Sequence, residues 1–160
     1  MPAFLSQLIA NWAAVFGNYS ALRTAVDFAH VGGLLAGGGC AVAADRATLI
    51  AARQEAQVRT QQLRALHGVH RVVLVALVFV VLSGVLLLAS DLQTYIASDI
   101  FWLKMGLVAL LLMNGGLLLR FERGAEQGLE RAWRGLCYAS IASLALWFLT
   151  TLAGVALTNI

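Results

Sequence analysis

The chain has 160 residues, of which 61% are hydrophobic and 12% are charged, and its formal net charge at pH 7 is +3. A soluble domain is about half apolar and about a quarter charged, so this composition excludes an ordinary soluble protein and predicts one compact membrane domain. The basic residues lie beside long apolar runs, as they do in loops next to a membrane, which argues against a nucleic-acid partner. Cys40 and Cys137 both fall in apolar runs, so no structural disulfide is expected.

Residues 3–17 are expected to form a short helix at the membrane surface. Their apolar residues recur at spacings of three and four, which indicates one apolar helix face. The segment is too short to span a bilayer and contains Gln7 and Asn11, so an interfacial helix is predicted. A helix that binds a partner protein is the alternative.

Four later segments are long and apolar enough to cross a bilayer, which takes ~20 residues. They are residues 22–44, 69–89, 101–119 and 135–157. The predicted fold is therefore all-α: a polytopic membrane protein with a four-transmembrane-helix bundle and an N-terminal interfacial helix.

The polar segments between the spans predict the topology. Segment 45–66 lacks Gly and Pro and is expected to be a cytoplasmic helix or helical extension, or alternatively a docking surface for a subunit. Segments 45–66 and 120–134 are rich in arginine, whereas the charged residues of the short loop 90–100 are all acidic. The positive-inside rule then places 45–66 and 120–134 in the cytoplasm and both termini outside, in a bacterial inner membrane.

The first span carries two ionisable residues among its glycines. Asp27 and His30 are three residues apart and share a helix face, and such residues at membrane depth usually face a bundle interior. The small residues that follow, including Gly33 and Gly37, predict close helix packing rather than a phosphate-binding loop.

A polar pocket is expected near the outer side of the membrane. On the predicted topology, Asp27 lies roughly 8 Å from the start of its span and Lys104 roughly 5 Å from the start of its own. The two charged residues are therefore expected to pair and to form a polar pocket with His30 as its floor. Such a pocket would bind a propionate, a quinone head or a proton. A purely structural pair, or a lysine that reaches the interface, is the alternative.

His30 is also a candidate ligand for haem iron, because imidazole suits iron and holds haem in many electron carriers. His67 and His70 lie three positions apart at the inner edge of the second span and are weaker candidates for sharing a metal or haem contact on that side, the alternative being two ordinary interfacial histidines. The depth of His70 differs from that of His30 by about 15–20 Å, so both cannot hold one haem. Haem b at His30 would need a single histidine, or a second ligand such as Met105, Met113 or Lys104.

Two features of the sequence resemble the CopD-like group of bacterial inner-membrane proteins. The first is His30, early in the first span and followed by paired glycines. The second is the segment from Gly84 through Trp102 and Lys104 to Arg120. The layout is also similar to that of the membrane-bound protoporphyrinogen oxidase. The resemblance covers roughly residues 28–120, and it implies a helical bundle that holds haem b or handles copper, with His30 and Lys104 at the matching positions.

These observations favour a redox-linked or haem-associated accessory subunit of a larger membrane complex, surrounded by lipid and other membrane subunits. No catalytic activity of its own is expected. The alternatives are a protoporphyrinogen oxidase-like enzyme, a purely structural subunit and a copper-handling protein, the last disfavoured because Met-rich copper-binding motifs are absent.

Overall fold

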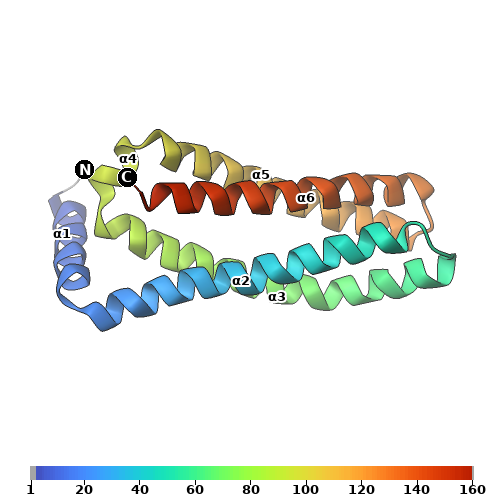
Figure 1. Ribbon diagram of the computed structural model, residues 1–160, viewed down its shortest axis with the longest axis horizontal. Coiled ribbons are helices and arrows are strands. Elements are labelled where there is room, and N and C mark those ends of the chain that lie inside the picture. The colour runs from blue at the N-terminus through green and yellow to red at the C-terminus, as the bar shows by residue number, and fades with distance from the viewer. Residues whose placement is uncertain (1–2, 160) are drawn as a thin grey trace.

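The computed structural model describes residues 3–159 and consists of helices joined by short turns (Figure 1). The helices are α1 (Ala3–Asn18), α2 (Ser20–Ala51), α3 (Ala56–Ser90), α4 (Leu92–Ala97), α5 (Asp99–Glu126) and α6 (Glu130–Leu157). Helices α2, α3, α5 and α6 are each long and apolar enough to cross a membrane. The predicted all-α four-helix bundle is confirmed.

The four long helices form two antiparallel hairpins, α2–α3 and α5–α6 (Figure 1). The hairpin turns, residues 52–55 and 127–129, lie at one end of the bundle, which we call the hairpin end. Helices α1 and α4 lie at the opposite end, the terminal end. The hairpins meet mainly through α2 and α6, whereas α3 and α5 contact each other much less.

The glycines of α2 bring its backbone close to two other helices. A Cβ on Gly33 would lie 2.8 Å from Cγ2 of Val80, and one on Gly37 would lie 2.9 Å from Cβ of Ala76. Gly38 packs in the same way against Trp147 of α6. Small residues at these positions therefore allow the approach that the sequence predicted.

Segment 45–66 extends the spanning helices at the hairpin end. Helix α2 continues to Ala51, and α3 begins at Ala56 after a short turn. This agrees with the predicted helical extension. A compact apolar core stabilises the same end and comprises Leu63, Leu66, Ala125, Ala132, Trp133 and Leu136.

The turn between α5 and α6 has a defined helix-ending geometry. Gly128 has a φ of 79°, which a residue with a Cβ adopts only at a cost. The backbone N–H of Gly128 donates to the carbonyl of Ala125 at 3.0 Å, and that of Leu129 donates to Gly124 at 3.2 Å. This is the Schellman arrangement, and it turns the chain back toward the membrane.

The terminal end contains more helix than expected. Residues 90–100 were predicted to be a simple loop, but α4 occupies Leu92–Ala97 within it. The carboxylate of Asp91 accepts a hydrogen bond from the backbone N–H of Thr94 at 3.4 Å and so caps α4. Helix α1 lies across this end (Figure 1), and Nε1 of Trp12 donates to the carbonyl of Leu86 at 2.8 Å.

Candidate functional site

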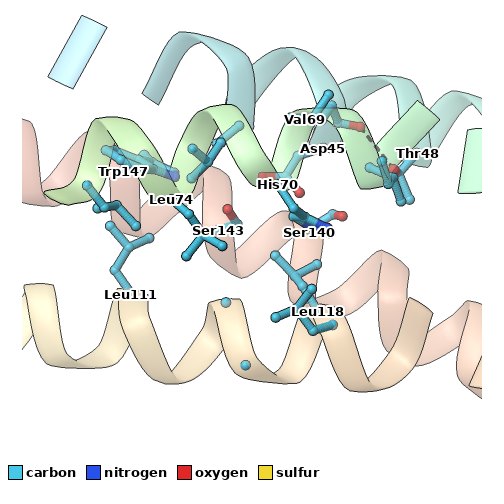
Figure 2. Close-up of a pocket in the computed structure, with 18 of the residues that line it drawn as sticks. Asp45, Thr48, Val69, His70, Leu74, Leu111, Leu118, Ser140, Ser143 and Trp147 are labelled. Carbon is cyan, nitrogen blue, oxygen red and sulfur yellow. Dashed lines mark hydrogen bonds between the residues drawn. The ribbon is translucent and has the colours of Figure 1, made fainter. Parts of the chain in front are cut away.

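A pocket of about 340 Å³ lies between the two hairpins, in the half of the bundle nearer the hairpin end. Side chains of α2, α3, α5 and α6 line it, and most of them are apolar. Figure 2 shows the main ones: Asp45, Thr48, Val69, His70, Leu74, Leu111, Leu118, Ser140, Ser143 and Trp147. The polar members come from α2, α3 and α6, so a few hydrogen-bonding groups converge on an apolar cavity.

Asp45 is the buried acid of this pocket. It is 5% exposed, and Ser140 and Ser143 of α6 face its carboxylate (Figure 2). Ser140 and Ser143 lie close enough to interact with this carboxylate, yet within residues 3–159 neither Oδ2 of Asp45 nor Oγ of Ser140 makes a hydrogen bond within 3.5 Å. Buried polar atoms without partners are costly, so a ligand that supplied the missing hydrogen bonds would be stabilised here.

His70 connects the pocket to a second acid. It lines the pocket from α3, and its Nδ1 lies 3.2 Å from Oε2 of Glu122 on α5. The Glu122 side chain is 4% exposed. A carboxylate beside one ring nitrogen orients the imidazole and leaves Nε2 available for another partner.

His67 lies beside the same acid, nearer the solvent. Its Nδ1 is 3.8 Å from Oε1 of Glu122, and its Nε2 is 3.6 Å from Oε1 of Glu126. The two histidines singled out in the sequence thus meet two glutamates that were not. The spacings held a signal, since His67 and His70 are at positions i and i+3 and Glu122 and Glu126 at positions i and i+4, so each pair shares a helix face.

His30 lies outside this pocket, between α2 and α3. Its Nδ1 is 3.1 Å from the carbonyl of Val80 and 3.0 Å from Oγ of Ser83. The Ser83 hydroxyl donates to the carbonyl of Phe79 at 2.6 Å, so it acts as an acceptor toward His30. Nδ1 must therefore carry the proton, and in the neutral imidazole Nε2 has the free lone pair.

A glycine makes room for this ring. A Cβ on Gly84 of α3 would lie 3.3 Å from Cε1 of His30. His30 is level with Val80 and Ser83, and these residues are about 15–20 Å along α3 from His70. The separation between His30 and His70 along the bundle is therefore the one expected from the sequence.

The pairing expected between Asp27 and Lys104 is not formed. No ion pair joins them within 4.0 Å in the described part of the chain. Nζ of Lys104 instead points toward α6, 3.5 Å from the position of a Cβ on Gly154. Asp27 is exposed and lies near Tyr95 of α4, where burial raises the pKa of the tyrosine and Asp91 and Asp27 add to the rise. The difference arises because α5 is rotated so that Lys104 faces α6, whereas equal depth was the only basis for the expected pair.

Comparison with known protein families, with curated proteins and with solved structures finds no match for this chain. The resemblance to CopD-like proteins therefore stays a prediction. The fold defines the class: a membrane protein with an all-α four-helix bundle. Its candidate site combines an apolar pocket with the buried acids Asp45 and Glu122, neither of which the sequence singled out as functional.

Proposed function

We propose that this protein is a redox-linked accessory subunit that binds a quinone-class ligand in the pocket around Asp45. The observation that carries the proposal is the pair of unpartnered polar atoms, Oδ2 of Asp45 and Oγ of Ser140, in an apolar cavity of about 340 Å³. Ligand pockets commonly measure roughly 300–1,000 Å³ and combine apolar walls with a few placed polar groups. A quinone matches this chemistry, because it is an apolar ring with oxygen atoms at two edges.

The lining supplies a role for each part of such a ligand. Leucine side chains and the indole of Trp147 offer apolar contact to the ring. The Ser140 hydroxyl can donate to a quinone oxygen, and the Asp45 carboxylate can accept from the hydroxyl of the reduced form. His70, with Nδ1 beside Glu122, offers Nε2 for proton transfer. The proposal assigns no residue of this chain as the electron donor. Electrons would therefore come from a neighbouring subunit, and the protein would act as one subunit of a larger complex.

Titration of the purified full chain in detergent with a short-tailed ubiquinone, and under reducing conditions with the corresponding ubiquinol, tests this proposal. Binding is followed by quenching of tryptophan fluorescence and by calorimetry. We expect saturable binding of both forms. Ser140→Ala should weaken quinone binding and Asp45→Asn should weaken quinol binding, each about ten-fold, since one buried hydrogen bond is worth ~1.4 kcal/mol. Asp27→Asn is the matched control, because Asp27 is an exposed acid on the same helix. Absence of saturable binding, or equal quinol affinity in Asp45→Asn and the unmodified chain, would refute the proposal.

Haem b at His30 is the second candidate function. The Nδ1–H tautomer favours it, because an axial histidine donates through one ring nitrogen and coordinates through the other. Nε2 of His30 would coordinate the iron, and the Lys104 cation would attract a propionate. A bound haem would supply one-electron chemistry. Copper handling and protoporphyrinogen oxidation remain lesser proposals on the same residues.

The hairpin end is proposed to face the cytoplasm of a bacterial cell. Arginines gather there, within the first hairpin turn and on both sides of each turn: Arg46, Arg53, Arg59, Arg64, Arg120, Arg123, Arg131 and Arg134. The positive-inside rule supports this orientation. Labelling with a membrane-impermeant thiol reagent tests it, in variants without Cys40 and Cys137 that carry Glu55→Cys or Asp91→Cys. In intact cells whose outer membrane has been permeabilised, only the cysteine at position 91 should react, and reaction at position 55 would reverse the topology.

A further inference from the structure

The hairpin end contains a cluster of nitrogen and oxygen donors to which the quinone proposal assigns no ligand. His67 of α3 and Glu122 and Glu126 of α5 each offer one donor atom, and these three atoms lie within 4.8 Å of one another. His67 and Glu126 are exposed, whereas Glu122 is buried. The cluster is therefore open to water through His67 and Glu126, and the Glu122 carboxylate forms its buried floor.

The buried Glu122 carboxylate has unused hydrogen-bonding capacity. Oε1 of Glu122 has no hydrogen-bond partner among residues 3–159. Nδ1 of His67 is 3.8 Å away, beyond hydrogen-bond distance. The other oxygen, Oε2, is 3.2 Å from Nδ1 of His70. One oxygen of this carboxylate is thus oriented by His70. The other lies within ion-pair distance of His67 but makes no hydrogen bond, so it is available to coordinate a cation in the cluster.

From this geometry we infer that His67, Glu122 and Glu126 bind a divalent first-row transition ion such as Zn²⁺, with His70 orienting Glu122. An imidazole nitrogen with two carboxylate oxygens suits such ions, whereas Ca²⁺ and Mg²⁺ prefer oxygen ligands alone. Zinc takes its nitrogen and oxygen ligands at about 2.0–2.2 Å. Closing the donors onto an ion needs only small movements of the two exposed side chains.

Such an ion would join two helices that otherwise touch little. Its ligands come from α3 and α5, one from each hairpin, and these helices contact each other less than either contacts its hairpin partner. Binding would therefore hold the two hairpins together at this end of the bundle. The inference does not depend on the quinone proposal, because it concerns a different ligand and different donor atoms.

Zinc binding to the metal-stripped full chain in detergent tests the inference. We expect calorimetry to show one Zn²⁺ per chain, and Co²⁺ to give the visible absorption of a low-symmetry site. His67→Ala and Glu126→Gln should each weaken binding at least ten-fold, and both positions are exposed, so folding should survive. Glu55→Gln, an exposed acid in the α2–α3 turn, is the matched control and should bind as the unmodified chain does.

Thermal unfolding provides a second readout. Zn²⁺ should raise the unfolding midpoint of the unmodified chain and of Glu55→Gln, because a ligand that binds only the folded state stabilises it. The rise should be lost in His67→Ala and Glu126→Gln. The inference is overturned by absence of stoichiometric binding, by unchanged affinity in both ligand variants, or by an equal loss in Glu55→Gln, which would indicate adventitious binding to surface acids.

Discussion

Trp147 of α6 packs directly on Gly38 of α2, and a Cβ at that glycine would lie 3.1 Å from Cε3 of the indole. Both residues are buried, and Trp147 also lines the pocket around Asp45. Because the hairpins meet mainly through α2 and α6, this contact sets how closely they approach. The width of the pocket therefore depends on the absence of a side chain at position 38.

Gly38→Ala should destabilise the bundle by about 1–3 kcal/mol, the usual cost of overpacking a tight contact. Gly39→Ala is the control, because a Cβ on Gly39 meets nothing within 4 Å. Unfolding in mixed micelles with increasing denaturing detergent measures both. Equal stability of the two variants would mean that the Gly38–Trp147 contact does not limit the approach of the helices.

Asn114→Ala should cost about 1 kcal/mol, in the range measured for polar contacts between membrane helices. Asn114 is 7% exposed, and its Nδ2 donates to the carbonyl of Ala139 on α6 at 2.9 Å. The neighbouring Met113 is 68% exposed, so Met113→Ala serves as a control for loss of side-chain volume on the lipid side. The same unfolding assay applies, and a cost no larger than that of Met113→Ala would contradict this account.

Arg59→Ala should destabilise the hairpin end by about 2 kcal/mol. Its Nη2 donates to the carbonyl of Ala52 at 2.8 Å, and its guanidinium lies 5.5 Å from the ring centroid of Trp133. The ion pair with Glu130, at 3.1 Å, is a minor part of this, because the glutamate side chain is 77% exposed.

Glu130→Gln should therefore cost less than about 1 kcal/mol, and comparing it with Arg59→Ala separates the two contributions. Chemical unfolding followed by tryptophan fluorescence measures both variants, and Trp133 is one of the four tryptophans that contribute to the signal. A larger effect from Glu130→Gln than from Arg59→Ala would show that the surface ion pair dominates.

His30→Ala should abolish the Soret band of the reduced-minus-oxidised spectrum if haem b binds at this position. Ser83→Ala should keep the band, because Val80 still accepts from Nδ1 of His30. Absorption spectra of protein purified with added haemin provide the measurement. Absence of a Soret band from the unmodified chain would eliminate haem binding at His30. The role of His30 would then be the hydrogen bonding that links α2 to α3. If the band is present, porphyrin fluorescence after addition of protoporphyrinogen distinguishes a carrier from an enzyme.

The sequence by itself determined the class of the molecule and its long helices. Hydropathy is a property of each segment, so four apolar runs predict four spanning helices in any packing arrangement. The small residues at 33 and 37 likewise predicted close packing, because the absence of a side chain is local information. Even the separation of His30 from His70 followed from the rise per residue along a helix.

Only the tertiary structure decided which side chains meet. Asp45 with Ser140, and His70 with Glu122, come from different helices, and their meeting depends on how each helix is rotated and shifted along its neighbour. The expected approach of Asp27 and Lys104 rested on equal depth alone, and rotation of the two helices turns Lys104 toward Gly154 instead. A sequence records the depth of a residue in a helical bundle, but packing between helices selects the face it presents and therefore its partner.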